Sequence, residues 1–199
     1  MPDWEIRTVN PPLVGVRTYR PEDQEACRAL WAELTQHHRD LYEDESIGGE
    51  QPALYFDQHL AQVGADHIWV AERGGQVIGL MGLIYSESES EVEIEPIIVQ
   101  RGSRSAGVGQ ALVEQALACA RQASVQSTVG VRYLSVRPVA RNLDAIGFFY
   151  QAGFEVLGRV ELFMDLRSPD LARWKPGPEV ICGEGGHRTT VNRRWLFKF

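Results

Sequence analysis

The stretch RGSRSAGVGQAL, residues 101–112, decides how this sequence is interpreted. Gly107 and Gly109 carry no side chain, so an anion can approach their backbone amides closely. The segment that follows is helix-forming, and a helix N-terminus presents unpaired N–H groups and partial positive charge to the same place. Arg101 and Arg104 add charge. We interpret the stretch as a phosphate-binding loop, although glycines with this spacing also occur in ordinary turns.

A dinucleotide-binding loop is a competing interpretation. Such a loop follows an early parallel strand, and an acidic residue comes about 20 positions later. Here the glycines follow a predicted antiparallel meander in the second half of the chain. A nucleotide-binding oxidoreductase is therefore disfavoured.

The whole chain has the composition of one globular domain with a full core. It has 199 residues, of which 44% are hydrophobic and 24% charged. No apolar run approaches the ~20 residues of a membrane helix, and the N-terminus lacks a signal-peptide layout, so we expect a cytoplasmic protein without a membrane partner. The net charge of −7 disfavours nucleic acid as a partner and suits a cationic substrate.

The cysteines predict neither a disulfide framework nor a metal site. Cys27, Cys119 and Cys182 lie far apart in the sequence. Cys182 and His187 can offer two metal ligands, but two more would be needed. A glycine-rich turn is the favoured interpretation of that segment, and we expect no metal.

The hydrophobic pattern predicts alternating groups of strands and helices. Strands are expected at 14–20, 67–72, 76–86, 91–100, 131–136 and 154–166, and helices at 21–38, 53–63, 108–123 and 142–151. The three middle strands form a meander, and the later helices cross over. This order predicts a mixed α/β (α+β) fold with a central, mostly antiparallel sheet flanked by helices.

Two motifs resemble the GNAT superfamily of N-acetyltransferases. Arg104 to Gly109 match its acetyl-CoA signature, R/Q-x-x-G-x-G/A, and the sequence NLDAIGFFYQAGF at 142–154 resembles its N-x-x-A-x-x-F-Y-x-x-x-G-F segment. The predicted element order is also similar to that family's order. The resemblance implies an acetyl-CoA-dependent N-acetyltransferase domain over 1–167, followed by an extension at 168–199 that adds a strand or joins a dimer.

The resemblance also implies where acetyl-CoA, the co-substrate, binds. The fourth and fifth strands of the family splay apart, and the pantetheine arm pairs with the fourth strand there, as an added strand pairs with a sheet edge. Pro96 suits a break in that strand, since proline cannot donate to the ladder. The pyrophosphate lies on the loop and the following helix start. The implied residues are Ile97, Ile98, Val99, Arg104, Ser105, Ala106, Gly107, Val108, Gly109, Gln110, Asn142 and Phe149.

A glutamate on the fourth strand often serves as the base in this family. Glu91, Glu93 and Glu95 alternate in EVEIEPIIV, and their spacing of two predicts that they share one face. The resemblance favours Glu95 as the catalytic base, with Glu93 as the alternative. A merely solvated acidic strand face stays open.

The general acid of the family does not match this sequence. Its tyrosine falls on Phe149, which has no proton to give, and Tyr150 is turned by about 100° along the helix. Either Tyr150 swings inward to act as the acid, or water or the product ammonium protonates the thiolate. The second alternative is favoured.

The resemblance places the acceptor beside the loop between the first two helices. That loop is acidic and suits an ammonium-bearing small molecule, although it is equally well a solvated loop; its acidic residues are Glu43, Asp44, Glu45 and Glu50. We expect direct attack by a primary amine of a small cationic metabolite or antibiotic on acetyl-CoA in a ternary complex. A protein acceptor and a catalytically weak acyl-CoA-binding regulatory module stay open, and the family implies a homodimer.

Overall fold

A mixed five-stranded sheet forms the centre of the computed structural model, which describes residues 13–86, 88, 90–126, 130–159, 179–182 and 187–190. Its strands follow one another in spatial order from β1 to β5. The first four pair antiparallel, and β4 pairs parallel with β5. The strands are β1 Gly15–Thr18, β2 Ile68–Arg73, β3 Gln76–Ser86, β4 Glu91–Val99 and β5 Tyr133–Val136.

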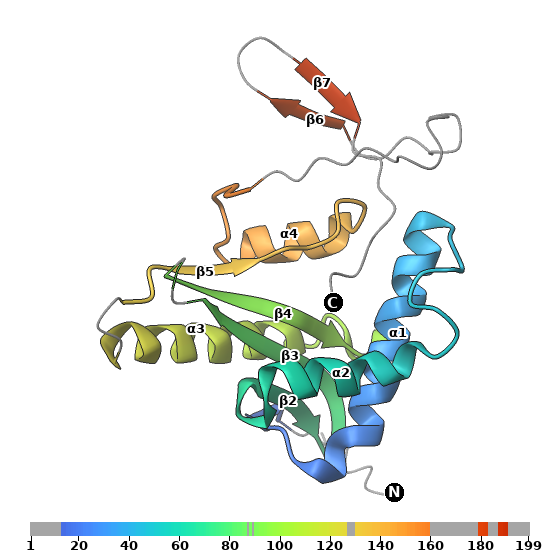
Figure 1. Cartoon of the computed structure of the whole chain (residues 1–199), viewed down its shortest axis with the longest axis vertical. Coiled ribbons are helices and arrows are strands. Elements are labelled where there is room, and N and C mark those ends of the chain that lie inside the picture. The colour runs from blue at the N-terminus through green and yellow to red at the C-terminus, as the bar shows by residue number, and fades with distance from the viewer. Residues whose placement is uncertain are drawn as a thin grey trace, which may run out of the picture.

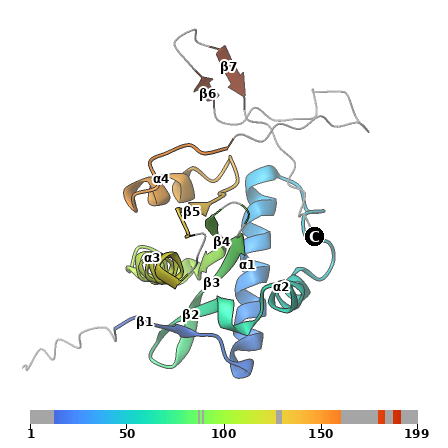
Figure 2. The same cartoon turned by 60° about the vertical axis from the view of Figure 1, so that its left-hand side comes forward.

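Helices cover both faces of this sheet. Figure 2 shows α1 (Gln24–Tyr42) and α2 (Tyr55–Val63) on one side and α3 (Val108–Gln126) on the other. The helix α4 (Leu143–Gln151) follows β5 and lies above it in Figure 1. Single 3₁₀ turns introduce or link these elements, namely η1 Pro21–Asp23, η2 Pro52–Leu54, η3 Ala65–His67 and η4 Arg101–Ser103.

Two apolar clusters hold the layers together. On the α1–α2 face, Trp31 and Phe56 pack on sheet residues such as Leu80 and Ile98. On the α3 face, Leu112 lies in a cluster that also contains sheet residues and Phe149 of α4; its sheet members include Met81, Leu83, Val92 and Ile94. Each helix thus buries one apolar stripe against the sheet, as an amphipathic helix of a layered domain does.

The start of α1 is fixed to the sheet by an ion-pair network. The Arg17 guanidinium on β1 donates two hydrogen bonds to Asp23, of 2.7 and 2.9 Å, and two to Glu72 on β2. Asp23 is buried and also accepts from the backbone N–H of Arg20 at 2.8 Å. The Arg17 guanidinium lowers the pKa of Asp23 below its usual range. The network therefore sets where the chain leaves β1 and begins the helix.

A bulge in β4 reverses the side-chain alternation of that strand. Met81 of β3 pairs with Ile97 and Leu83 pairs with Ile94, so β4 has one residue more than β3 between these two pairs. Val92 and Ile94 therefore face the α3 cluster, but beyond the bulge it is Ile97 that packs there. The extra residue lies at Glu95–Pro96, where the peptide bond is cis. Proline suits this point because the ladder is broken there.

The predicted fold class is confirmed, with local differences. Helix α1 runs on to Tyr42 and ends at Glu43, whose φ of 50° is left-handed, whereas the sequence analysis ended it near residue 38. The strand expected at 154–166 is absent from its described part, 154–159, where Val156 and Leu157 are exposed rather than packed. Its remainder lies outside the described residues.

The C-terminal extension is described only in part. Two short strands, β6 (Glu179–Cys182) and β7 (His187–Thr190), form an antiparallel hairpin. The strand that the C-terminal extension is expected to add fits the sequence TTVNRRWLFKF at 189–199; its first two residues lie in β7, and the rest is outside the described residues. Across the described part of the chain, no helix combines the length and the apolar character needed to cross a membrane.

Candidate active site

Strands β4 and β5 separate halfway along β4. Their last paired residues are Ile94 and Val136, while β4 continues to Val99 and stays paired with β3 along its other edge. The edge of β4 that faces β5 is therefore not paired with that strand from Glu95 to Val99. A strand edge of this kind can accept an extended ligand through its backbone groups. The predicted pantetheine residues Ile97, Ile98 and Val99 lie along it.

The predicted phosphate loop lies between this edge and the start of α3. Gly107 has a φ of +77°, which favours glycine, and a Cβ built on it would meet no atom of the described residues within 4 Å. Ser105 is also left-handed, with a φ of 61°, and the residues from Arg104 to Gly107 are exposed. The loop is anchored by Arg73, which donates to the Ala106 carbonyl oxygen at 3.3 Å. The space over Gly107 therefore fits a phosphate cradle.

Arg104 and Gly109 have contacts within the protein as well. The Nε of Arg104 donates to the Val99 carbonyl oxygen at 3.2 Å, which joins the loop to the end of β4. A Cβ on Gly109 would lie 3.1 Å from the ring of Phe148 in α4. The glycine at 109 therefore has a packing reason of its own. Val108 is buried in the core, while Gln110 is exposed on the first turn of α3.

Helix α1 reaches over to this region. The carboxylate of Glu33 accepts the backbone N–H of Arg101 at 2.5 Å, and His37 forms a side-chain hydrogen bond with Asn142. Asn142 in turn caps α4 by accepting the backbone N–H of Ala145 at 3.1 Å. Burial and the nearby Arg104 charge lower the pKa of His37. The helix that borders the predicted acceptor site thus contacts both the phosphate loop and the start of α4.

An acidic cluster occupies the paired part of β4. Glu91 and Glu93 are buried, each with a side chain only 9% exposed. Burial, together with the charges of Glu95 and Glu91, raises the pKa of Glu93 to about 7, against the opposing effect of Arg137. A carboxyl group with this pKa can accept and release a proton near neutral pH. The cluster therefore has the chemistry expected of a general base.

Glu95 lies at the bulge, where β4 leaves β5. Its side chain keeps exposed surface, yet the surrounding protein desolvates the carboxyl enough to raise its pKa, while Arg137 opposes this. The charge of Glu95 also raises the pKa of Glu93, so the two carboxyls are close enough to interact. The α1–α2 face contributes His59, whose Nε2 is buried beside the Glu95 carbonyl.

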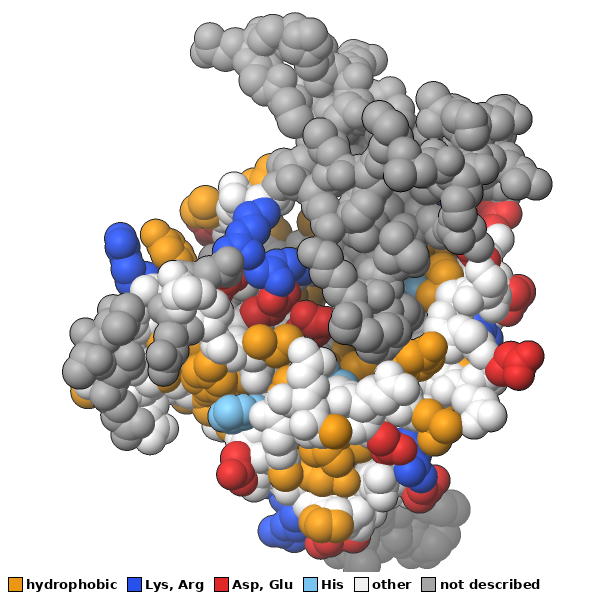
Figure 3. Space-filling view, viewed as in Figure 1, with side chains coloured by type: hydrophobic (Ala, Val, Ile, Leu, Met, Phe, Trp, Pro, Cys, Tyr) orange, Lys and Arg blue, Asp and Glu red, His pale blue; other side chains and the backbone are white. Residues whose placement is uncertain are grey.

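The sequence analysis missed two arginines and a serine of this cluster. Arg137 bonds to Glu93, Arg159 donates to Glu91 Oε2 at 2.9 Å, and the Ser135 hydroxyl donates to Glu91 Oε1. Figure 3 shows acidic and basic side chains side by side, bordered by hydrophobic ones, on the face that carries α2. The available signal was the position of Arg137 directly after the strand that pairs parallel with the acidic one.

Phe149 and Tyr150 take opposite environments on α4. Phe149 is 6% exposed and packs edge-on against Phe148 and Phe154. It is therefore part of the apolar core, and its predicted contact with acetyl-CoA stays a prediction. Tyr150 is 63% exposed. The rotation of one residue along the helix thus turns its hydroxyl away from the core side of α4.

The acidic loop after α1 is folded around Arg39. This arginine donates to the carbonyl oxygens of Ile47, at 2.9 Å, and Gly49, at 2.6 Å. Its guanidinium lies 3.9 Å from the exposed Glu45 carboxylate. The loop therefore has a defined shape beside α1, and some of its acidic charge is balanced internally.

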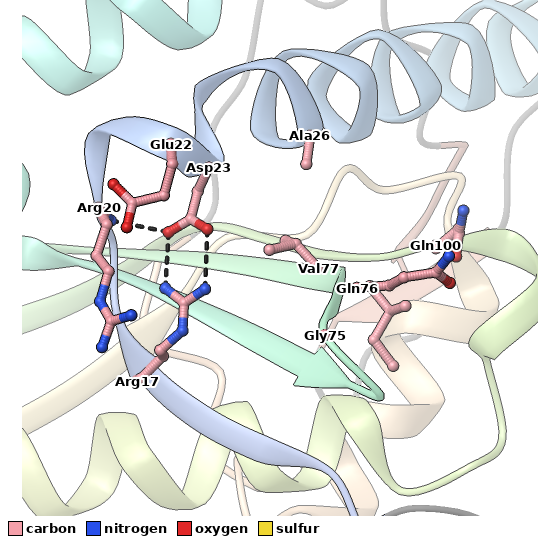
Figure 4. Close-up of a pocket in the computed structure, with 10 residues that line it drawn as sticks. Arg17, Arg20, Glu22, Asp23, Ala26, Gly75, Gln76, Val77 and Gln100 are labelled. Carbon is pink, nitrogen blue, oxygen red and sulfur yellow. Dashed lines mark hydrogen bonds and ion pairs between the residues drawn. The ribbon is translucent and has the colours of Figure 1, made fainter.

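A separate polar cavity of about 540 Å³ lies at the start of α1. Figure 4 shows Arg17 and Asp23 joined in its wall, with Gly75 and Gln76 of the β2–β3 turn nearby. None of the predicted cofactor or catalytic residues lines it. Arg17 in this wall is already paired with two carboxylates, those of Asp23 and Glu72.

A sheet that opens between β4 and β5 above a glycine-bearing helix start is the architecture of the N-acetyltransferase class. The model of the acetyltransferase (GNAT) family matches residues 25–154. The chain therefore belongs to this family and is a GNAT-type acetyltransferase, and enzymes of the family use acetyl-CoA. No curated protein matches the chain.

Solved structures share the fold at low sequence identity. One is a transcriptional regulator from Bacillus halodurans C-125, with a TM-score of 0.57 and 19% identity over 77% of this chain and 100% of its own. Another is a ribosomal-protein-alanine N-acetyltransferase from Brucella melitensis, with a TM-score of 0.56 and 22% identity over 72% and 86%. A third is an aminoglycoside N-acetyltransferase in complex with CoA, with a TM-score of 0.56 and 20% identity over 79% and 98%.

The described residues can also be compared with the arrangement of ligands that a metal ion needs. Among them, no three His, Cys, Asp or Glu side chains gather as metal ligands would. The candidate pair Cys182 and His187 lies opposite one another in the β6–β7 ladder. The absence of a metal in the mechanism stays a prediction.

Proposed function

We propose that the protein transfers the acetyl group of acetyl-CoA to a primary amine of a small cationic molecule. The observation that carries this proposal is the edge of β4 from Glu95 to Val99 that does not pair with β5, followed in the chain by the cradle over Gly107. When bound, acetyl-CoA supplies a thioester whose carbonyl carbon the amine attacks, with the CoA thiolate as the leaving group. Arg104 and the amides from Ser105 to Gln110 would hold the pyrophosphate.

Carboxylates of this chain would take a proton from the acceptor amine before it attacks. An ammonium group must lose a proton before it can attack, and Glu95 or Glu93 accepts that proton. The pKa of Glu93, about 7, supports this role at neutral pH. Water or the reacting nitrogen supplies the proton for the departing thiolate, because Phe149 has none to give and Tyr150 is exposed.

The charge of the site supports a cationic acceptor. Glu91, Glu93 and Glu95 lie together on β4, where Arg137 and Arg159 balance part of their charge, and the loop after α1 adds further carboxylates. The aminoglycoside enzyme among the solved relatives acts on a substrate class of this kind, while the ribosomal-protein enzyme supports a protein amine as a second candidate. A homodimer and a cytoplasmic location stay predictions from the sequence.

The cofactor part of the proposal is tested by calorimetry with CoA. Gly107→Ala forces a side chain into a left-handed residue and into the open cradle, so we expect at least a tenfold loss of affinity, or about 1.4 kcal/mol. Gly102→Ala is the matched control, since Gly102 is in the same loop, is not left-handed and has open space around it. Equal CoA affinity in both variants would contradict the cradle. Gly109 is left unchanged here because of its contact with Phe148.

The transferase part is tested with a panel of amines and a free-thiol assay. We expect thiol release only when a suitable amine is present, and an N-acetylated product by mass spectrometry. CoA binding without thiol release across the panel would instead favour the regulatory module.

A further inference from the structure

The acidic cluster of β4 carries a cation that the proposed mechanism has not used. Arg137 bonds to Glu93 Oε2 through Nη1, and its Nη2 lies 3.6 Å from Glu91 Oε1. The arginine side chain is 48% exposed, whereas both glutamate side chains are only 9% exposed. A half-exposed guanidinium thus covers two buried carboxylates.

Arg137 is located where β4 and β5 separate. The last ladder pair joins Ile94 to Val136, so Arg137 is the first residue of the β5 segment beyond that ladder. From this point it reaches back to Glu93, and its charge also acts on Glu95. It therefore lies at the point where β4 and β5 diverge, which we call the fork. In the proposed function, the thioester of acetyl-CoA and the acceptor amine meet there.

The two buried glutamates differ in how they are held. Glu91 receives the Ser135 hydroxyl at Oε1 and Arg159 at Oε2, so both of its oxygens have donors. Arg137 engages Glu93 through a single oxygen, Oε2. Glu91 is thus suited to a fixed structural role, whereas Glu93 depends on Arg137.

We propose that Arg137 is a positioning residue, which holds the Glu93 carboxylate at the fork in its ionised form and thereby makes Glu93 the group that takes the proton from the acceptor amine. This inference rests on the proposed transferase function. The proton moves from the ammonium nitrogen to a Glu93 oxygen, and no bond to Arg137 is made or broken beyond the hydrogen bond.

The charges around Glu93 give this role its physical reason. Glu91 and Glu95 from β4 and burial favour the protonated form, while Arg137 after β5 and Arg159 from the 154–159 segment favour the ionised form. The balance leaves the pKa of Glu93 at about 7. Without Arg137 this pKa rises, so Glu93 would already carry a proton at neutral pH and could not accept another.

The first test is the pH profile of kcat/KM for Arg137→Gln. Loss of an adjacent opposite charge shifts a carboxyl pKa by about 1 to 3, so the acidic limb moves to higher pH by at least about one pH unit. Activity at about pH 6 then falls about tenfold or more, and most of it returns at about pH 9. Arg137→Lys keeps the charge and should recover part of the shift.

Arg159→Gln is the matched control. It removes one positive charge from the same cluster, but its guanidinium bonds to Glu91. We expect a smaller shift of the acidic limb than in Arg137→Gln. An equal loss of activity at every pH in Arg137→Gln, or equal shifts in both variants, would overturn the proposal. Thermal melts identify any variant that fails to fold.

The assignment to Glu93 is tested in a second background. Glu93→Gln should abolish the acidic limb near neutral pH and lower kcat/KM, and the further change Arg137→Gln should then add little to this loss. If Glu93→Gln keeps the limb and most of the activity, the proton goes to another group, such as Glu95, and the proposal is wrong.

A readout without turnover separates this inference from the proposed function. Carbon-13 NMR of glutamate-labelled protein should show one carboxyl titrating near neutral pH, and Arg137→Gln should move it upward. An unchanged titration overturns the inference. The expected titration together with no acetylation of any amine overturns the proposed function and leaves the link between Arg137 and Glu93 standing.

Discussion

A Cβ on Gly109 of α3 would lie 3.1 Å from Cζ of Phe148 of α4, so the two helices touch where one of them has no side chain. Phe148 also packs edge-on against Phe149, with 5.1 Å between ring centroids. The contact therefore links the helix that starts at the phosphate loop to the buried aromatic residues of α4.

Replacement of Gly109 by alanine should reveal this contact when it is compared with Gly147→Ala. Both glycines are helical, but a Cβ on Gly147 meets no atom within 4 Å. Gly147→Ala should raise the free energy of unfolding by up to about 1 kcal/mol through helix propensity. Gly109→Ala should come out about 1–3 kcal/mol lower than Gly147→Ala in urea denaturation, because the Phe148 ring must move. Equal values would refute the packing role.

Gly82→Ala should disrupt the bulge of β4. A Cβ at this position would lie 2.4 Å from the Glu95 carbonyl oxygen and 2.7 Å from His59 Nε2. A backbone atom cannot rotate away, so we expect a loss of about 3 kcal/mol in the free energy of unfolding. Gly15→Ala is the control on another strand, because a Cβ there meets nothing within 4 Å. A Gly82→Ala protein as stable as that control would contradict the bulge geometry.

Two buried histidines should make the protein less stable in mild acid. Burial lowers the pKa of His38 and of His59 from 6.5 to about 4. Between these values the unfolded chain binds more protons than the folded chain. Each histidine therefore stabilises the fold above pH 6.5, and this stabilisation of about 3 kcal/mol is lost as the pH falls toward 4. Urea unfolding at about pH 5 and about pH 7 measures the loss.

The titration of Glu93 changes the stability of the protein in the opposite direction. Its pKa is raised from 4.5 to about 7, so its contribution to stability is present below 4.5 and is lost as the pH rises to 7.

His59→Gln removes one of the two buried histidines. Because Glu93 acts in the opposite direction, this variant should lose less stability between neutral and acidic pH, or should gain stability in acid. His67→Gln, an exposed histidine, should leave the loss as it is in the unchanged protein. If both variants keep the full loss, His59 is not its source.

Tyr150→Phe should leave turnover almost unchanged. The Tyr150 side chain is 63% exposed, whereas its neighbour Phe149 is in the core. A general acid contributes about 10²–10⁴ to a rate, so removal of a catalytic hydroxyl would be obvious in kcat. We expect less than a threefold change with acetyl-CoA and an accepted amine. A hundredfold decrease would instead make Tyr150 the acid.

The sequence predicted the features that depend on local pattern. The meander of the three middle strands, the glycine loop before α3 and the order of the elements follow from turn residues and hydrophobic spacing, which are visible within a short window. The family resemblance then supplied candidate roles for the residues that match its motifs.

Contacts between residues far apart in the sequence could not be predicted from local patterns. Glu93 and Arg137 are 44 residues apart, and Glu91 and Arg159 are 68 apart, so their pairing appears only once β5 lies beside β4. Pro96 indicated a break in β4, but the register shift itself could not be predicted, because a shift of one residue changes faces without changing residue types. The packing of Gly109 on Phe148 is missed for the same reason.

The bulge divides β4 into two short segments. Even-numbered side chains face α3 in the first segment, and odd-numbered side chains face α3 in the second. If the strand were regular and kept all its residues, Ile97 and Val99 would turn from the α3 layer to the opposite layer, and Ile98 would make the reverse exchange. Deletion of one residue between Ile94 and Ile97 would instead restore a regular strand and leave these three side chains on the faces that they occupy now. Random deletion libraries of this strand should therefore be depleted less between Ile94 and Ile97 than in its regular first half, where a deletion exchanges the faces of the side chains on one side of it.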